Sequence, residues 1–196
     1  LRTLDRQTDI PLSIDTSKPD VARAALDAGA SILNDVRGFT DPEMLEVATG
    51  SPARLVVMHM RGEPRTMQET PSYPDVMTEV SAFLRERADA LMDRGIQADR
   101  IFLDPGIGFG KRLEDNLRIL REIESFRKLG HPLLVGPSRK SFLAGLAGEA
   151  RPEDRLPGGL ATVSWLALRG VRVVRVHDVR EAVEALRVIQ AMAGAA

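Results

Sequence analysis

Short apolar runs alternate with longer amphipathic stretches along most of the chain. The apolar runs predict strands near residues 10–14, 31–36, 54–60, 101–103, 133–136 and 171–176. The stretches between and after them predict helices near 19–28, 42–49, 75–94, 116–128, 160–168 and 181–192, with one more directly after Ser138. Strands that alternate with helices in this way form a mainly parallel sheet through right-handed crossovers.

Two architectures fit this alternation. Six units in 196 residues average about 33 residues each. Eight such units would need roughly 260 residues, close to the ~250 of a (β/α)8 barrel. The pattern therefore permits a (β/α)8 TIM barrel of which this chain represents about six βα units, and it equally permits an open, doubly wound sheet.

Composition excludes several classes of protein. The 27 basic and 28 acidic side chains nearly balance, so the excess of Lys and Arg that nucleic-acid binding needs is missing. No apolar segment approaches the ~20 residues of a membrane span, and the polar start of the chain has no signal-peptide core. The lack of cysteine excludes disulfides and thiolate metal sites, and it fits a reducing, cytoplasmic compartment.

Polar side chains follow every predicted strand at its carboxyl end, which is where parallel α/β folds bind ligands. They are Asp15-Thr16, Asn34-Asp35, His59, Asp104, Ser138-Arg139-Lys140 and Arg175 to Asp178. Such residues often only cap the next helix, as we expect for Thr16, Asp35 and Asp178. We expect ligand contacts from the others that follow an apolar run directly, Asp15, Asn34 and Asp104.

Two strings suggest the chemistry of that ligand. Residues 104–111, DPGIGFGK, match neither a Walker A loop nor a dinucleotide fingerprint, but their glycines would let a ligand approach the backbone. Residues 136–141, GPSRKS, form a candidate anion site. Arg139 could equally be a surface ion pair, whereas Arg175 and His177 lie on one side of a strand and favour an anion ligand. His131 is expected to be structural, and no metal-ligand spacing or catalytic triad is evident.

Taken together, the strings SIDT (13–16), LNDV (33–36), MHMRGEPRTMQ (58–68), DPGIGFGK (104–111), GPSRKSF (136–142) and RVHDV (175–179) resemble the dihydropteroate synthase family in order and spacing. The resemblance implies a (β/α)8 barrel that joins 6-hydroxymethyl-7,8-dihydropterin pyrophosphate to p-aminobenzoate. The products would be 7,8-dihydropteroate, used in folate biosynthesis, and pyrophosphate, which leaves in a dissociative displacement.

The resemblance also implies roles for individual residues. Catalysis would involve Asp15, Lys140 and Arg175. The pterin would be bound by Asp15, Asn34, Met58, Asp104, Lys140 and Arg175. The p-aminobenzoate would be bound by Phe109, Ser138 and Lys140, and the pyrophosphate by Arg175 and His177. Mg2+ would be the cofactor, but its family ligand precedes SIDT, so no metal ligand is expected in this chain.

The family has two βα units before SIDT, and here only about ten residues precede that motif. We therefore expect a single pterin-binding barrel domain over residues 1–196 that is incomplete at its N-terminus and poorly active alone. Family members are commonly homodimers, and the apolar face at 160–168 with Trp165 is a candidate surface. Two other functions stay open, a methyltetrahydrofolate-dependent methyltransferase and a noncatalytic pterin-binding subunit.

Overall fold

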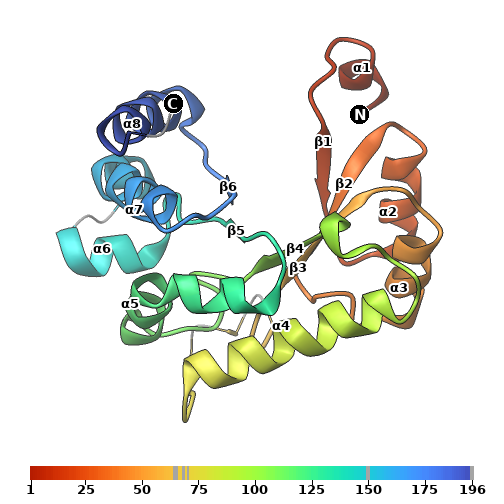
Figure 1. Cartoon of the computed structure of the whole chain (residues 1–196), viewed down its shortest axis with the longest axis horizontal. Helices are drawn as coiled ribbons and strands as arrows, with labels where there is room; N and C mark the ends of the chain where they lie inside the picture. The colour runs from red at the N-terminus through yellow and green to blue at the C-terminus, as the bar shows by residue number, and fades with distance from the viewer. Residues whose placement is uncertain (64–65, 68, 70, 149–150, 195–196) are drawn as a thin grey trace. The chain divides into compact units, whose positions relative to one another are not determined.

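The computed structural model describes residues 1–63, 66–67, 69, 71–148 and 151–194, and it shows the alternation of strands and helices (Figure 1). The strands are β1 (Leu12–Asp15), β2 (Ala30–Asp35), β3 (Arg54–Met58), β4 (Ile101–Asp104), β5 (Leu134–Val135) and β6 (Val173–Val174). The α-helices are α1 (Arg2–Asp5), α2 (Pro19–Leu26), α3 (Pro42–Thr49), α4 (Val76–Met92), α5 (Leu113–Arg121), α6 (Ser141–Ala147), α7 (Leu156–Leu168) and α8 (Val179–Met192). Three short 3-10 helices are η1 (Ala98–Arg100), η2 (Ile123–Leu129) and η3 (Pro152–Arg155).

Two helices begin three or four residues earlier than the sequence pattern predicts, and local capping explains one of them. Helix α5 starts at Leu113, where the Asp115 carboxylate accepts the Arg112 backbone N–H at 3.0 Å. Helix α7 starts at Leu156, and a proline lies in its first turn, where the missing N–H costs nothing. The spacing of apolar residues reveals only the part of a helix that packs against the core. It therefore does not reveal first turns that consist of charged, proline or glycine residues.

One compact unit contains residues 1–60, 80–105 and 129–132. Its four strands form a parallel sheet in the order β1-β2-β3-β4 (Figure 1). A doubly wound sheet reverses its strand order near the middle, whereas consecutive strands of a barrel are neighbours. The order observed here therefore favours the barrel.

The core of this first unit is apolar and buried. Its buried side chains include Leu33, Leu55, Val57, Ile101 and Leu103 from β2, β3 and β4. Helices α2 and α3 lie side by side along the sheet (Figure 1). Strands with such near-continuous apolar runs are typical of sheets that are covered on both faces.

A second compact unit contains residues 61–79, 106–128 and 133–196. Its two short strands, β5 and β6, pair in parallel, with Leu134 opposite Val173 and Val135 opposite Val174. Helices α7 and α8 lie side by side (Figure 1). The predicted strands 133–136 and 171–176 are longer than the observed ones, which are limited to the residues that pair in the two-stranded sheet.

Candidate active site

The strand register in the first unit brings four predicted pterin residues to one face of the sheet. Asp15 is paired with Asn34, and Met58 is paired with Asp104. Asn34 is also paired with Val56, two residues before Met58. Paired residues and alternate residues of a strand share a face. Asp15, Asn34, Met58 and Asp104 therefore lie on the same face, near the carboxyl ends of the strands.

These side chains differ in exposure. Asp15 is exposed, whereas Asn34 and Asp104 are only 7% and 6% exposed. In the described part of the chain, the buried Asn34 Oδ1 atom accepts no hydrogen bond. Buried polar atoms in folded proteins are nearly always hydrogen-bonded, to protein, water or ligand. Asn34 therefore offers an acceptor to a ligand that carries an N–H donor.

Asp35 has a different role from the one predicted. Its carboxylate accepts the backbone N–H groups of Arg37 and Phe39, both at 2.9 Å, and the hydroxyl of Ser17. The cap of helix α3 is instead Asp41, which accepts N–H groups of the first turn. The expectation that Asp35 caps the following helix is wrong, because a tight turn after β2 uses both carboxylate oxygens.

The predicted cap at Thr16 is also wrong. Lys18 occupies the N-cap position of α2, and no side chain there makes a capping hydrogen bond. Thr16 Oγ1 instead accepts the Lys18 backbone N–H at 3.1 Å, two residues on. His131 is structural as predicted, since it is buried and its Nδ1 lies 3.1 Å from the Ala98 carbonyl oxygen.

A cationic pocket lies within the second unit. Its volume is about 540 Å3, and it is lined by Ser138, Lys140, Arg175 and His177 among others. The His177 backbone N–H donates to Ser138 Oγ at 3.3 Å, and the His177 ring Nδ1 lies 3.0 Å from the same oxygen. The predicted ligand-binding residues that follow β5 and β6 thus share one pocket.

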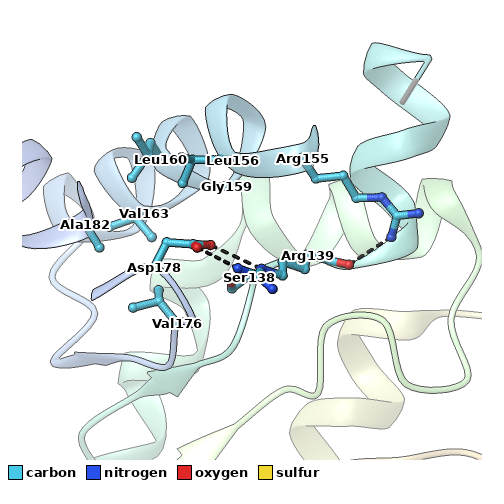
Figure 2. A pocket seen from close by; sticks show the side chains of 10 residues that line it. All are labelled: Ser138, Arg139, Arg155, Leu156, Gly159, Leu160, Val163, Val176, Asp178 and Ala182. Carbon is cyan, nitrogen blue, oxygen red and sulfur yellow. Dashed lines mark hydrogen bonds and ion pairs between the residues drawn. The ribbon is translucent and has the colours of Figure 1, made fainter. Parts of the chain in front are cut away.

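Arg139, which also lines this pocket, is paired with Asp178 (Figure 2). The Arg139 guanidinium donates through Nε and Nη2 to the two carboxylate oxygens, at 3.2 and 2.6 Å. This hydrogen bond and the charge of Arg139 lower the pKa of Asp178. Asp178 is at the N-cap position of α8, but its side chain makes no capping bond. The predicted capping role of Asp178 is therefore wrong, and the ion-pair alternative for Arg139 is right.

The contacts of Ser138 and His177 raise the question of nucleophilic catalysis. Ser138 and His177 are within hydrogen-bond reach, as a nucleophile and its base would be. A triad needs a third group that orients the histidine, and the neighbouring Asp178 carboxylate is bound to Arg139 on both oxygens. Ser138 and His177 thus lie together in the cationic pocket, where the sequence predicted ligand contacts.

The glycine-rich loop after Asp104 is held closely by its surroundings in the second unit. Gly106, Gly108 and Gly110 have φ values of +69°, +77° and +60°. A Cβ atom on Gly110 would lie 2.1 Å from the Arg61 carbonyl oxygen. The sequence interpretation assigned these glycines to ligand approach, but at Gly110 the close neighbour is the chain's own backbone. The Lys140 Nζ atom lies over the Phe109 ring, 3.6 Å from its centroid.

Sequence reasoning missed three residues that support this loop. Lys111 and Asn116 are buried and bond to its backbone. The Tyr73 hydroxyl donates to the Gly110 carbonyl oxygen at 2.8 Å, and burial raises the pKa of Tyr73 to about 12. The rarity of lysine, four residues against 23 arginines, is a weak signal for Lys111. Nothing in the pattern singles out Tyr73 or Asn116.

No magnesium site is evident among the residues that the structure describes. The residues that the structure describes contain no group of three or more His, Cys, Asp or Glu side chains that could hold a metal ion. Residues 64, 65 and 68 of the string 58–68 lie outside the described residues. The described residues do not by themselves fit Mg2+, and its role stays a prediction.

Comparison with known proteins identifies the family. Residues 1–177 match the family described as "Pterin binding enzyme". A dihydropteroate synthase of Synechocystis sp. is 42% identical over 193 residues, which cover 98% of this chain and 67% of the relative.

Solved structures agree. Dihydropteroate synthase from Stenotrophomonas maltophilia, with imidazole in its active site, matches with a TM-score of 0.96 at 40% identity, covering 100% of this chain and 74% of the other. The Xanthomonas albilineans enzyme in complex with 7,8-dihydropteroate matches with a TM-score of 0.92 at 41% identity, covering 98% and 72%. The fold class is thus the predicted (β/α)8 barrel, with six βα units in the described residues. This chain belongs to the dihydropteroate synthase family.

Proposed function

We propose that the protein carrying this chain condenses 6-hydroxymethyl-7,8-dihydropterin pyrophosphate with p-aminobenzoate, giving 7,8-dihydropteroate and pyrophosphate. The observation that carries this proposal is the set of acceptors on one sheet face, above all the buried Asn34 Oδ1, which accepts no hydrogen bond from the described residues. A reduced pterin is a flat heterocycle whose ring and amino N–H groups are donors. Acceptors held in register on a sheet are suited to such a ligand.

We assign recognition of the pterin ring to the first unit. Asp15 and Asp104 would accept N–H groups as carboxylates, in charge-assisted hydrogen bonds that are stronger than neutral ones. Asn34 would accept a further donor, and the buried Met58 side chain lies on the same face to pack against the ring. Contacts from Lys140 and Arg175 to the pterin stay predictions.

We assign the anionic groups to the second unit. Arg175 and His177 would bind the pyrophosphate, and Ser138 and Lys140 would bind p-aminobenzoate beside the Phe109 ring. Positive charge in a preorganised pocket stabilises the negative charge that develops on a departing pyrophosphate. The bond from the pterin methylene carbon to the pyrophosphate oxygen would break first, and the arylamine nitrogen would then attack that carbon and lose a proton.

The Asp15 side chain would stabilise the positive charge of the pterin cation between these steps. Such a mechanism needs charge stabilisation and no protein nucleophile. No step is assigned to Mg2+, because the described residues do not provide its site.

Pyrophosphate release provides the test. The whole protein that carries this sequence is mixed with the dihydropterin pyrophosphate, with and without p-aminobenzoate. Release that depends on the arylamine, with 7,8-dihydropteroate as the product, is the expected result. Binding of the pterin pyrophosphate without any release would contradict the proposal and favour a noncatalytic pterin-binding subunit. Methyl transfer from methyltetrahydrofolate would favour the methyltransferase alternative.

We further propose a homodimer through the apolar groove formed by α5, α6 and α7. The groove has a volume of about 400 Å3 and is lined by Leu117, Leu120, Phe142, Leu146 and Trp165 among others. Trp165 is 40% exposed although its Nε1 donates to the Leu120 carbonyl oxygen at 2.8 Å. Trp165→Asp should convert a dimer to a monomer in light scattering, and a variant that stayed dimeric would remove this contact from the proposal.

The compartment is a separate prediction. No helix in the described ranges is both long and apolar enough to pass through a bilayer. The cytoplasmic location rests on the lack of cysteine and stays a prediction, which localisation of the tagged whole protein would test.

A further inference from the structure

Lys111 is a charged residue for which the proposed reaction has no use, and it is only 3% exposed. Lysine is almost never fully buried unless its charge is paired or hydrogen-bonded. The chain also uses arginine nearly everywhere else, with only four lysines among 27 basic residues. A buried lysine at the end of the glycine-rich loop therefore calls for a physical explanation.

The Lys111 ammonium is bound by the loop that precedes it. Its Nζ atom donates to the Gly106 carbonyl oxygen at 2.9 Å and to the Phe109 carbonyl oxygen at 3.1 Å. These two carbonyls lie three residues apart, and left-handed glycines at 106 and 108 turn the chain between them. The backbone thus winds around a cation that the protein supplies from its own sequence.

Asn116, on helix α5, also hydrogen-bonds this loop. Its side-chain Oδ1 accepts the Gly108 N–H at 2.7 Å, and its Nδ2 donates to the carbonyl oxygens of Lys111 and Arg112 at 3.2 and 2.8 Å. Asn116 is itself buried. Both bonding groups therefore act in a water-poor environment, where hydrogen bonds are electrostatically stronger than in water.

Phe109 depends on these bonds for its position. It is flanked by Gly108 and Gly110, which have no side chains to pack and hold the backbone. Its ring is half-buried, and Lys140 Nζ lies over it, 3.6 Å from the ring centroid. A Cβ atom on Gly108 would lie 2.9 Å from Lys140 Cδ, so loop and lysine side chain are in close contact. A loop shift of even 1 Å would change the geometry of the Phe109–Lys140 pair.

We propose that Lys111 is a positioning residue for the arylamine. Its ammonium holds the carbonyl groups of the glycine-rich loop and so sets the Phe109 ring against Lys140, where p-aminobenzoate is bound. This inference rests on the proposed function for the identity of the ligand. The placement of the loop by Lys111 is a separate claim that can be measured without any substrate.

Lys111→Met in the whole protein tests the proposal, because methionine fills similar space but has no donor for the two carbonyl groups. We expect the KM for p-aminobenzoate to rise at least tenfold, while kcat and the KM for the dihydropterin pyrophosphate change less than threefold. Amide hydrogen exchange in residues 106–110 should speed up at least tenfold, with that in β1 to β4 unchanged. Lys128→Met, which removes an exposed lysine from η2, is the matched control and should resemble the wild type.

The outcomes separate the possible roles. An unchanged KM for p-aminobenzoate, or an equal rise in both KM values together with a general loss of exchange protection, would overturn the proposal. If Lys111→Met does not fold, Lys111→Arg keeps a donor group and should raise the KM for p-aminobenzoate by a smaller factor; no rise would again overturn it. If the wild type shows no arylamine-dependent pyrophosphate release, the proposed function fails, and hydrogen exchange still decides whether Lys111 holds the loop.

Discussion

The two compact units place their polar and charged side chains by different means. In the first unit, Asp15, Asn34 and Asp104 share a face because the strand register puts them there. In the second unit, the strands β5 and β6 have two residues each. Its functional residues lie on loops, and bonds between side chains hold those loops. Sheet positions are set by many backbone hydrogen bonds, whereas loop positions depend on a few identifiable partners.

This contrast has consequences for mutation. Removing a functional side chain from the sheet edge should damage binding and leave the strand in place. Removing a residue that supports a loop of the second unit, such as Lys111 or Asp178, should instead displace the residues to which it is hydrogen-bonded. Buried charged residues illustrate the contrast. Asp104 is the last residue of strand β4, whereas Lys111 is surrounded by the loop to whose carbonyl groups it donates hydrogen bonds.

The largest expected effect is on the sheet edge. Asp104→Ala removes a buried carboxylate and should weaken binding of the dihydropterin pyrophosphate by about 2–3 kcal/mol, as expected for hydrogen bonds to a charged group. That loss corresponds to roughly 30- to 150-fold in Kd. Calorimetry measures the affinity, and thermal unfolding should show little change. Asp99→Ala, at an exposed position of η1, is the control; equal affinity of the two variants would remove Asp104 from the site.

The next effect concerns the cationic pocket of the second unit. Lys140→Ala should weaken binding of the pterin pyrophosphate by about 1–3 kcal/mol, if the ammonium makes one charge-assisted hydrogen bond to this ligand. The same calorimetric titration measures it, with Lys128→Ala as the matched control on an exposed lysine. Unchanged affinity would contradict the role of Lys140 in this substrate's site.

A smaller effect is expected from the Arg139–Asp178 ion pair. Arg139 lowers the pKa of Asp178 below its ordinary value of 3.8. A lowered pKa means that the folded state prefers the ionised carboxylate, so the stabilisation is present above about pH 4 and lost as the pH falls through the folded pKa. Urea unfolding should show Asp178→Asn less stable than the wild type at pH 7, with a gap that narrows below pH 4. A gap that is independent of pH would show that the charge of Asp178 is not involved.

The smallest expected effect concerns Tyr73, whose hydroxyl supports the glycine-rich loop, and it involves no change in activity. Tyr73 is the chain's one tyrosine, so absorbance of tyrosinate near 295 nm follows it alone. Burial raises its pKa from 10.0 to about 12, against the opposing charge of Arg61. The folded chain therefore holds the phenol proton more tightly and should lose stability as the pH rises from 10 towards 12. A titration midpoint near 10 in the folded protein would mean that Tyr73 is accessible to water.

Much of the site was accessible from the amino-acid sequence. Polar residues at the ends of apolar runs predicted the sheet-edge residues Asp15, Asn34 and Asp104, because a strand's direction and period place them without further information. The strings at 104–111 and 136–142 carried the family resemblance, which the comparisons confirm. The alternation of elements left the barrel and the open sheet equally possible, and only the sequential strand order favours one of them.

The sequence by itself determined which residue types stand at the ends of which strands, and thereby the family and its candidate ligands. Only the tertiary structure decided the partners: Asp35 bonds the turn after β2, Asp178 pairs with Arg139, and Lys111 bonds its own loop. The physical reason is that hydrophobic period and strand direction are local properties of the chain. A hydrogen bond between Arg139 and Asp178 joins residues 39 positions apart, and its partner is chosen by how the loops pack in space.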